Sequence, residues 1–518
     1  MMSEQKMNKS FADKFVFVNK GREIHDEKIQ TKPIGYFKDA WLRFIRNKSA
    51  LVAFVLIIIQ ILFAIIVPFF SKYDVEYRDP YYAHKLPKSH LFASLGFWDG
   101  IKSDNAYEGD YYTLKATEKE TGKTIIVEDK GAYVDSAGIT KHTIRYDDYL
   151  SVGFVYKDLT KSEFDKLQAY QDENGIQIMY PIQKTWDTKK INFSNGNNGA
   201  NFWYKLEDES AGSNGMPALE NGAFVANYLT TTDKQSAGYV SNMRIACDDG
   251  SSGEWYIYAK RVGTTGNMYR VRVDYHEYYK YFYQHEPFFL FGTNVYGQDI
   301  FTCLAAGARL SFALSIVVCL INFVIGACYG AIEGYYGGAA DMIMERISDI
   351  LYDVPFMVVA TLFQMHLAKK VGVLPSLLFA FVLTGWVGMA ARVRTQFYRF
   401  KGHEYVLAAR TLGARDRRLI FKHIFPNSLG TIITSSVLAI PGVIFSESIL
   451  SYLGIVNLET SSMTSIGTLL AGGQGFLKDF PHEILFPALF ISILEISFNL
   501  FGNGLRDAFN PSLRGAED

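Results

Sequence analysis

The sequence has little cysteine, and none of it is arranged in the pairs that hold zinc. Its 518 residues contain four cysteines, no two of which form a CxxC pair: Cys247, Cys303, Cys319 and Cys328. This spacing excludes a zinc ribbon and a fold held together by disulfides. Only Cys247 lies well inside the polar segment 71–286, and whether it pairs with Cys303 stays open.

The chain also lacks an excess of charge of either sign. It has 52 Lys and Arg against 53 Asp and Glu, so no positive surplus is available to neutralise nucleic-acid phosphates. The balance argues against nucleic acid as a partner. The overall balance conceals an uneven distribution along the chain. The segment 71–286 holds 25 Lys and Arg, 31 Asp and Glu, and 24 of the 33 tyrosines. The chain is therefore not one uniform soluble globule.

Motifs that carry catalysis are missing as well. The segment 71–286 has no HExxH, no GxSxG and no calcium-loop spacing, and the chain has no GxxxxGK[ST] phosphate loop. The histidines of that segment are not spaced as metal ligands on one element: His84, His90, His142, His276 and His285. We predict no catalytic residue and no metal site, and we expect no ATP hydrolysis by this chain. The acidic stretch 248–254 fits a turn better than a cation site.

Long hydrophobic runs are present instead. The run 49–70 has 22 residues without a charge, and a helix needs about 20 apolar residues to cross roughly 30 Å of hydrocarbon. Because 48 mostly polar residues precede it, we expect a retained span and not a signal peptide. Five further apolar runs follow: 310–332, 350–368, 371–391, 428–446 and 484–501. We predict an α-helical multi-pass membrane protein with six transmembrane helices.

The distribution of Lys and Arg in short flanks predicts the orientation. Four basic residues precede the first span and make segment 1–48 cytoplasmic: Lys38, Arg43, Arg46 and Lys48. Six spans then return the C-terminus to the cytoplasm. The stretch 392–423 between the fourth and fifth spans carries nine Lys and Arg against Glu404 and Asp416, and it also falls in the cytoplasm. Both arguments leave the segment 71–286 outside.

The outside segment 71–286 is long enough to bury a core of its own. Stretches such as TIIVEDKGAYV and EWYIYAKRVG alternate apolar and polar residues between turn sequences such as SNGNNG, as strands do. A capping-box pattern at Thr160 predicts a short helix to Tyr170. The Tyr-rich stretch 275–284 fits a strand or a membrane-interface belt better than a partner-binding surface. We expect an inserted α+β or mostly β domain, followed by the other five spans in 287–518.

The segment 403–430 carries the strongest local signal. Residues 404–411 are good helix formers, Gly413 interrupts the helix, and Asp416 caps or opens a second helix that Pro426 ends. This order predicts a helix–turn–helix elbow on the cytoplasmic face, with small residues where another protein can pack and a basic rim. An ordinary basic loop is the alternative, and charge alone does not separate the two.

This elbow resembles the coupling loop, or EAA loop, of binding-protein-dependent ABC importer permeases. That motif has two alanines, a glycine and a proline at fixed spacing, which here are Ala408, Ala409, Gly413 and Pro426. Leu407 takes the Glu position of the general motif, and the nearest acidic residue is Glu404. The peptide and nickel branch of the family departs in the same way. The segment also matches that branch at Tyr405, Val406, Arg410, Leu412, Ala414, His423 and Asn427.

Four further stretches narrow the resemblance to the oligopeptide permease C subunit and extend it over all six spans: 35–57, 291–311, 447–455 and 498–515. The second departs from the pattern at three places, where Asn294, Gln298 and Thr302-Cys303 replace Asp, Arg and Ser-Arg. The segment 71–286 is not covered, because C subunits of this kind join their first two spans by a much shorter stretch. Comparable inserts occur in Gram-positive peptide permeases, so the resemblance implies a Gram-positive bacterial plasma membrane.

The resemblance implies a type I ABC importer permease fold and half of a heterodimeric pore for oligopeptides or dipeptides. The implied partners, besides membrane lipid and the peptide, are a B-type permease, two ABC ATPases that bind ATP and Mg, and an extracellular peptide-binding lipoprotein. No cofactor is implied for this chain itself. The coupling loop 402–428 would meet an ATPase through Glu404, Tyr405, Ala408, Ala409, Arg410, Gly413, Ala414, His423 and Pro426. The segment 71–286 would dock the lipoprotein or close over the pore mouth.

Ionisable residues inside spans cost several kcal/mol in lipid unless they face protein or water. Four such residues are candidates for the pore or for a contact between subunits: Asp353, His366, Glu447 and Glu495. A buried hydrogen bond between helices is an equal alternative. Import of nickel or another small solute, a secondary transporter and a membrane-anchored receptor also stay open. The last two lack support, since no inverted repeat and no cytoplasmic output domain are detectable.

Overall fold

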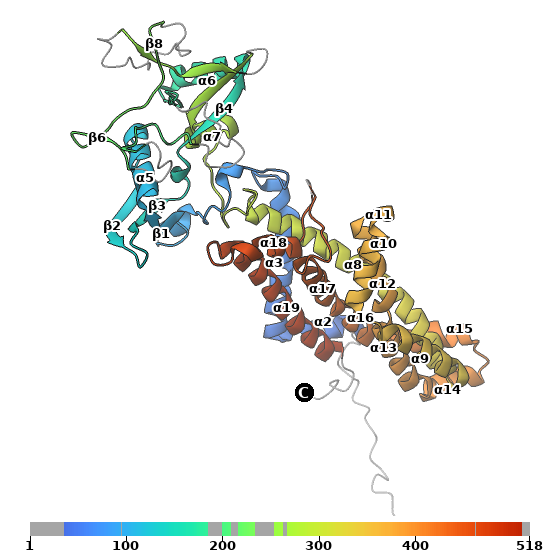
Figure 1. Cartoon of the computed structure of the whole chain (residues 1–518). Helices are drawn as coiled ribbons and strands as arrows, with labels where there is room; N and C mark the ends of the chain where they lie inside the picture. The colour runs from blue at the N-terminus through green and yellow to red at the C-terminus, as the bar shows by residue number, and fades with distance from the viewer. Residues whose placement is uncertain are drawn as a thin grey trace, which may run out of the picture.

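The computed structural model describes residues 36–94, 96–184, 199–208, 216–233, 253–262, 267–460 and 463–509. In Figure 1 these form a helical bundle and an α+β lobe that rises from one end of it. We call residues 89–288 the inserted lobe and the bundle end beneath it the lobe end. Cys247 and most of the acidic stretch 248–254 lie outside the described residues.

Among the described residues, five helices of the bundle are long and apolar enough to cross a membrane. A sixth span exists if two consecutive helices, Gly338–Tyr352 and Phe356–His366, are one broken span, with a bend of 71° between them. The helices of the bundle are α2 (Tyr36–Arg46), α3 (Lys48–Phe70), α8 (Ile300–Tyr336), α9 (Gly338–Tyr352), α10 (Phe356–His366), α11 (Ala368–Val371), α12 (Val373–Gly385), α13 (Val387–Lys401), α14 (Glu404–Thr411), α15 (Asp416–Arg418), the π-helical turn η6 (Leu419–Ile424), α16 (Phe425–Val437), α17 (Ala439–Tyr452), α18 (Ile466–Gly473), η7 (Gln474–Phe476) and α19 (His482–Phe509).

The hydrophobic runs predicted where the helices lie better than where they start and stop. Helix α8 begins ten residues before the run 310–332, because the Asp299 side chain caps it by accepting from the Thr302 N–H at 3.0 Å. The run 350–368 is bent and not straight. Pro355 explains the bend, since a proline disfavours helical backbone at the residue before it.

Close approach of backbones holds α8 against α13. A Cβ built on Gly326, Gly330 or Gly334 of α8 would lie under 3 Å from atoms of α13 or its N-cap. These glycines are spaced by four residues and therefore lie on one helix face. Small residues in this pattern let helices pack closely inside a membrane.

The described part of the inserted lobe is built around two antiparallel sheets. Strand order is β1-β3-β2 in one and β10-β11-β4 in the other, where β5 also pairs with β11. The elements of the lobe and of the segment leading to it are η2 (Pro80–Tyr82), α4 (His90–Ala93), β1 (Ile101–Tyr107), α5 (Glu108–Thr121), β2 (Ile126–Val134), β3 (Thr140–Asp147), η3 (Leu150–Val152), β4 (Phe154–Thr160), α6 (Lys161–Asn174), β5 (Met179–Tyr180), β6 (Leu219–Glu220), β7 (Ala223–Phe224), β8 (Thr230–Thr231), β9 (Trp255–Tyr256), β10 (Ala259–Val262), β11 (Met268–Asp274) and α7 (Tyr275–Tyr283).

The Tyr-rich stretch corrects one expectation. It is helix α7 and not a strand, because the alternating pattern ends with β11 at Asp274, whose side chain accepts from the His276 N–H and caps the helix. Tyr275 and Tyr279, four residues apart, share one helix face and are buried in the lobe core. The helix expected at Thr160 is confirmed with both bonds of its capping box, and it runs on to Asn174.

The lobe joins the bundle where its two ends meet. The Lys88 N–H donates to the Phe289 carbonyl at 3.0 Å, so the chain leaves and returns at one place. Lys85 is buried there, and its Nζ donates to the Asp148 carbonyl at 2.6 Å and contacts the carboxylate at 3.1 Å. The segment 71–88 is thus shared between the bundle and the base of the lobe.

Candidate functional site

The elbow, residues 402–428, lies at the far tip of the bundle from the inserted lobe, where Figure 1 shows α14 and α15. Its first helix spans Glu404–Thr411, as the sequence predicted. His403 precedes it in an extended conformation. The helix starts immediately after α13 and Gly402, so the elbow is a direct continuation of the bundle.

Gly413 turns the chain between the two helices of the elbow. Its φ of +82° is left-handed, which glycine adopts without the steric cost of a Cβ. The Gly413 N–H donates to the Arg410 carbonyl and the Ala414 N–H donates to the Ala409 carbonyl, both at 3.0 Å. These two bonds form a Schellman motif, which satisfies carbonyls at the end of α14.

The inner side of the elbow packs on the bundle. Val406, Leu419 and Ile424 are fully buried and belong to one apolar cluster with Phe397 of α13 and other residues of α8 and α13. Ala409 and Ala414 pack half-buried against this cluster. Among the predicted coupling residues His423 is also half-buried, and the exposed ones are Glu404, Tyr405, Ala408, Arg410, Gly413 and Pro426.

The outer side of the elbow presents apolar side chains that sequence reasoning did not single out as contacts. Leu412 is 89% exposed, Phe421 is 60% exposed and Leu407 is 46% exposed. Exposed basic residues lie near them in the sequence: Arg410, Arg415, Arg417 and Arg418. Leu412 directly before Gly413 is the sequence signal that could have identified this surface, because a glycine after a helix marks a turn.

Pro426 does not end the second elbow helix, contrary to prediction. The helix continues from Asp416 to Tyr452, through the π-helical turn η6. Pro426 sits in the first turn of α16, and the wide turn before it relieves the clash that a proline ring makes with a preceding carbonyl. The Asn427 side chain donates to the His423 carbonyl at 2.7 Å. Asp416 opens this helix, and Arg415 is its N-cap residue.

Two contacts between side chains tie the elbow to the end of α8. The Tyr335 hydroxyl donates to Asp416 Oδ1 at 2.6 Å. The Arg410 guanidinium lies 5.8 Å from the centre of the Tyr335 ring, within the range of a cation–π contact. Tyr335 therefore touches both arms of the elbow and fixes them relative to α8.

A cluster of charges close to the elbow was not predicted. Arg394 of α13 donates to Asp341 at 2.6 and 2.9 Å and to Glu345 at 2.8 and 3.1 Å, so it holds two carboxylates of α9 at once. Glu333 of α8, which is 2% exposed, lies 3.4 Å from the same guanidinium. The cluster joins α8, α9 and α13. Its partners are some fifty residues apart in sequence, so no local pattern indicates it.

The four ionisable residues predicted inside spans lie on different helices. Glu447 of α17 is 1% exposed and accepts from the Ser311 and Ser451 hydroxyls, each at 3.0 Å. Glu495 of α19 is half-buried, and its Oε1 is buried without a hydrogen-bond partner among the described residues. Asp353 is exposed at the bend after α9. His366 is exposed at the end of α10, with Nδ1 3.0 Å from the Leu362 carbonyl.

The stretch before α8 forms the rim of the bundle at the lobe end. Gly297 has a φ of +72°, and a Cβ there would lie under 3 Å from the Asp79 carbonyl, so only glycine fits. The Gln298 side chain donates to the Val75 carbonyl at 2.6 Å, and Asn294 Nδ2 donates to Gln298 Oε1 at 2.9 Å. Gln298 and Asn294, two departures from the family pattern, thus bond to each other.

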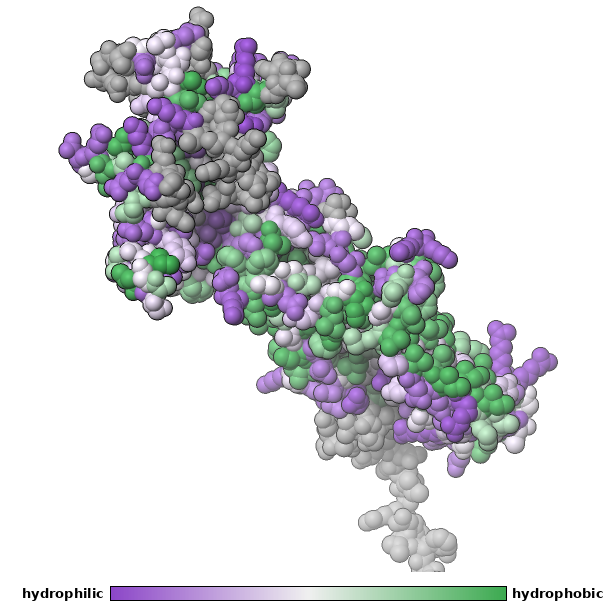
Figure 2. Space-filling model, viewed as in Figure 1, coloured by the Kyte–Doolittle hydropathy of each residue, from purple (hydrophilic) through white to green (hydrophobic). Residues whose placement is uncertain are grey.

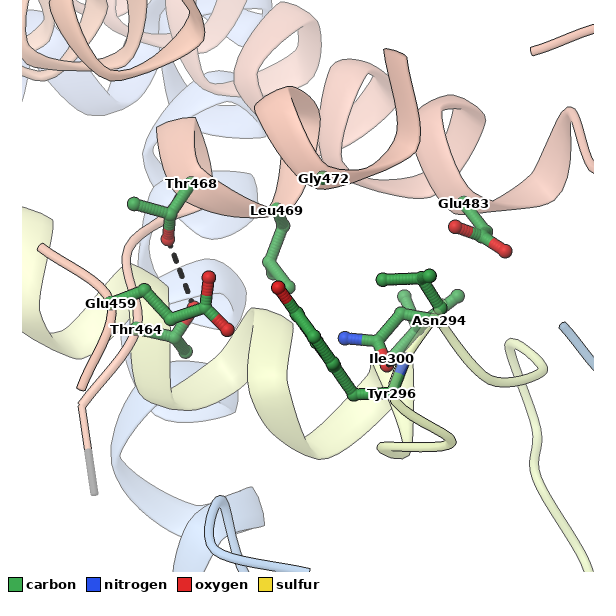
Figure 3. Close-up of a pocket in the computed structure, with 10 residues that line it drawn as sticks. Asn294, Tyr296, Ile300, Glu459, Thr464, Thr468, Leu469, Gly472 and Glu483 are labelled. Atoms are coloured by element: carbon green, nitrogen blue, oxygen red, sulfur yellow. Dashed lines mark hydrogen bonds between the residues drawn. The ribbon is translucent and has the colours of Figure 1, made fainter. Parts of the chain in front are cut away.

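A small pocket opens on this rim between the start of α8 and helix α18 (Figure 3). Tyr296 points from the α8 side toward Leu469 in this view, and Glu459 and Glu483 line the pocket as well. The Arg78 guanidinium lies 3.8 Å from Glu459 and 5.0 Å from the centre of the Tyr296 ring. His84 Nδ1 lies 2.5 Å from Glu483, which is 2% exposed.

Burial also shifts the pKa values of ionisable groups at the base of the lobe. Burial raises the pKa of Asp79, although the Tyr275 hydroxyl donates to it at 2.5 Å. Burial lowers the pKa of Lys157, whose Nζ lies 4.6 Å from the centre of the Tyr81 ring. Within the described ranges, no three His, Cys, Asp or Glu side chains are grouped so that they could hold a metal ion.

Comparison with known proteins gives matches on both sides of the insert. A family model described as the binding-protein-dependent transport system inner membrane component matches residues 322–515. A second, the N-terminal TM domain of oligopeptide transport permease C, matches residues 35–87. The whole of the inserted lobe, residues 89–288, lies outside both models.

Three curated relatives show the extent of the likeness. The oligopeptide transport system permease protein OppC of Bacillus subtilis is 42% identical over 224 residues, which cover 43% of this chain and 72% of that protein. The dipeptide transport system permease protein DppC of the same species is 40% identical, covering 43% and 69%. DppC of Lactococcus lactis is 37% identical, covering 44% and 65%.

Among solved structures, an inward-facing form of the MetNI methionine ABC transporter matches with a TM-score of 0.34 and 15% identity. The match covers 40% of this chain and 96% of that one. At this score the likeness is too weak for a comparison of individual elements.

Proposed function

We propose, because this chain belongs to the family of binding-protein-dependent transport permeases that includes oligopeptide permease C, that it forms one half of a peptide-conducting pore. It is a permease subunit of an ABC importer. The other half of the pore is a B-type permease, and the transported solute is an oligopeptide or dipeptide, as the names of its relatives suggest.

The elbow 402–428 receives an ABC ATPase, and its surface supports this assignment more than any other feature. Leu412, 89% exposed, would fit a pocket on a partner, and the exposed arginines of the elbow would attract acidic side chains. The ATPase supplies the ATP and Mg sites. This chain contributes the docking surface and the helices that move.

The contacts behind the elbow explain how a push on it would reach the pore. Its buried side packs on α13, Tyr335 ties both arms to α8, and Arg394 holds α8, α9 and α13 together. A displacement of the elbow therefore moves three helices of the bundle as one unit. This is the step that would switch the pore between its inward-open and outward-open forms.

Two of the four ionisable residues in the spans, Glu447 and Glu495, differ in their hydrogen-bond partners. Glu447 is occupied by two serines of the same chain, which supports a role in helix packing. Glu495 keeps a buried oxygen without a partner in the described residues, which supports a position facing the pore or the second permease. Asp353 and His366, both exposed, stay candidates for the same contact.

The orientation follows from the basic flanks. Both termini and the elbow lie in the cytoplasm of a Gram-positive bacterium, and the inserted lobe lies outside its plasma membrane. There the lobe docks the peptide-binding lipoprotein or closes over the pore mouth. A lobe-deleted complex with normal peptide uptake would contradict that role.

The decisive experiment replaces Leu412 by Glu and compares it with Leu219→Glu, which alters a 47% exposed leucine of the lobe. Tagged chains are pulled down from native membranes, and uptake of a labelled tripeptide and of nickel is measured. We expect the Leu412→Glu chain still to pull down the second permease, but no longer to pull down the ATPase subunit or to support tripeptide uptake. Unchanged recovery of the ATPase with Leu412→Glu would show that the elbow is not the coupling site. Nickel uptake without peptide uptake would show that the transported solute is nickel and not a peptide.

A further inference from the structure

An apolar patch projects from the foot of the inserted lobe. It consists of Leu91, Phe92, Phe97 and Trp98 and is called the Leu91 patch here. Leu91 is 81% exposed and Phe97 is 49% exposed, while Phe92 and Trp98 are half-buried. The loop that carries them is closed by the Ser89 N–H, which donates to the Trp98 carbonyl at 2.7 Å. The sequence 89–98 contains no Lys, Arg, Asp or Glu.

Trp98 sets the depth of the patch relative to the spans. Its ring centre lies 5.6 Å from that of Phe486 and 6.1 Å from that of Phe291. Phe486 is four residues into α19, which places it about 6 Å along the helix axis at 1.5 Å per residue. The patch therefore lies beside the N-terminal part of a membrane-spanning helix and not high on the lobe.

A chain of aromatic rings continues from the patch into the bundle. Phe291 stacks on Phe486 at 4.0 Å and meets Phe301 at 5.0 Å, and Phe301 meets Phe63 at 5.2 Å. Phe63 lies seven residues before the end of α3, about 10 Å inside that span. Trp98 thus stands at the upper end of a ring chain whose lower end is within the apolar part of the bundle.

Helix α19, which Trp98 contacts through Phe486, has an exposed apolar face. Leu485, Leu489, Ile493 and Ile496 recur at helical spacing and are 43–60% exposed. In Figure 2 green residues gather at the foot of the lobe as well as along the bundle. This face begins at Leu485, directly before the Phe486 that Trp98 contacts, so hydrocarbon that covers it reaches the level of the Leu91 patch.

We propose that the Leu91 patch is an interfacial anchor that inserts into the lipid leaflet at the lobe end. Its occupant is the bilayer itself, with Leu91 and Phe97 in the acyl-chain boundary and Trp98 at headgroup level. Tryptophan and other large apolar side chains favour this layer, and a loop without charges enters it at little cost. The anchor fixes the base of the lobe beside α19. This proposal depends on the bundle spanning a membrane, as the proposed function requires, and does not depend on which solute is transported.

The test places a fluorescent label at the patch in the assembled complex. Leu91→Cys and Phe97→Cys are made in a background with Cys247→Ser and Cys328→Ser, and each is labelled with an environment-sensitive nitrobenzoxadiazole. Leu219→Cys in β6, of exposure similar to Phe97, is the matched control. The complexes are reconstituted in nanodiscs of phosphatidylglycerol and phosphatidylethanolamine, with and without bromine on the acyl chains.

We expect brominated lipid to quench the label at positions 91 and 97 but not at 219, and aqueous iodide to quench in the opposite order. Equal quenching by iodide at all three sites, with no effect of bromine, would overturn the anchor. Shielding that arises only after the peptide-binding protein is added would also overturn it and make the patch a protein-docking surface. Because the readout needs no transport, failure of the peptide assignment leaves this result interpretable.

Discussion

Glycine serves two different purposes in the inserted lobe and in the helical bundle. In the lobe, Gly122 and Gly175 end α5 and α6 with positive φ, and a Cβ at either would meet no atom within 4 Å. In α8 of the bundle, Gly326, Gly330 and Gly334 are helical, and a Cβ on each would collide with α13 or its N-cap. The first group supplies backbone freedom, and the second supplies room.

The hydrophobic cores of the lobe and of the bundle also differ in how their residues pack. The lobe core is rich in tyrosine, whose hydroxyls bond to buried acids and carbonyls, such as Tyr228 to Glu120 at 2.6 Å and Tyr149 to the Leu86 carbonyl at 2.8 Å. Burial of large rings is a driving force only in water. Inside lipid, where the surroundings are already apolar, close packing of small residues takes over. The two regions therefore fold against two solvents.

The largest effect is expected in the lobe core at Arg272. This residue is fully buried, donates to both Glu120 oxygens at 2.7 and 2.6 Å, and lies 3.8 Å from the centre of the Phe154 ring. Arg272→Met strands a buried carboxylate and should lower the free energy of unfolding of the lobe by about 3–5 kcal/mol. Hydrogen exchange of β11, followed by mass spectrometry, measures the loss.

Arg270→Met is the matched control for that variant. Arg270 makes two bonds of 2.7 Å to Asp158, but the carboxylate is 41% exposed, so its loss should cost about 1 kcal/mol or less. Exchange in α8 should stay unchanged in both variants. Faster exchange in α8 together with β11 would break the comparison, because lobe and bundle would then unfold as one unit.

The next largest effect is expected at the α8–α13 contact. Gly330→Ala puts a methyl group against the Ala390 carbonyl, which belongs to backbone and cannot rotate away. Overpacking of this kind should cost about 1–3 kcal/mol. Gly388→Ala, on α13 itself but with nothing within 4 Å of the new methyl group, should cost nothing. Thermal stability of the detergent-solubilised complex separates the two, and equal melting temperatures would mean that α8 does not need its glycines for packing.

A smaller, pH-dependent effect is expected at Glu277 of α7. His276, with Nδ1 3.5 Å away, and Lys123, with Nζ 2.8 Å away, lower the pKa of this carboxyl from its ordinary 4.5. A lowered pKa adds stability above pH 4.5 that is lost as the pH falls below it. Glu277→Gln should therefore cost about 1–2 kcal/mol at neutral pH, and the difference from wild type should close below 4.5.

Thermal unfolding followed by near-ultraviolet circular dichroism, at neutral pH and at several values below 4.5, checks the Glu277 variant. Glu220→Gln, which changes an exposed carboxylate of β6, is the control for the loss of a surface charge. A constant deficit of Glu277→Gln at every pH would show that packing of the side chain matters and its charge does not.

Local signals explain what the sequence could predict. The bounds of α14 follow from its good helix formers and from Gly413, and α6 follows from the pair Thr160 and Glu163. A charge-free run was enough to locate α3. In each case the residues that decide the structure are neighbours in the sequence.

Contacts between distant residues explain what the sequence could not predict. Arg394 and Asp341 lie on different helices, and nothing near either one announces the other. A proline normally stops a helix, but the π-helical turn before Pro426 changes the local geometry so that the helix continues. In the Tyr-rich stretch the preference of tyrosine for strands hid the helical spacing of Tyr275 and Tyr279, which only the packed lobe core reveals.

The smallest effect sharpens the comparison, because Gly413 belongs to the bundle but behaves like a glycine of the lobe. It has φ +82° and nothing within 4 Å of an added Cβ, so only its backbone conformation should matter. Gly413→Ala should destabilise the Schellman turn by about 1 kcal/mol, whereas Gly413→Asn should cost less because asparagine adopts this conformation more readily. Hydrogen exchange at the Ala414 amide, which bonds across the turn, measures both. Equal losses with Ala and Asn would mean that Gly413 provides room for a partner, as the glycines of α8 do for α13.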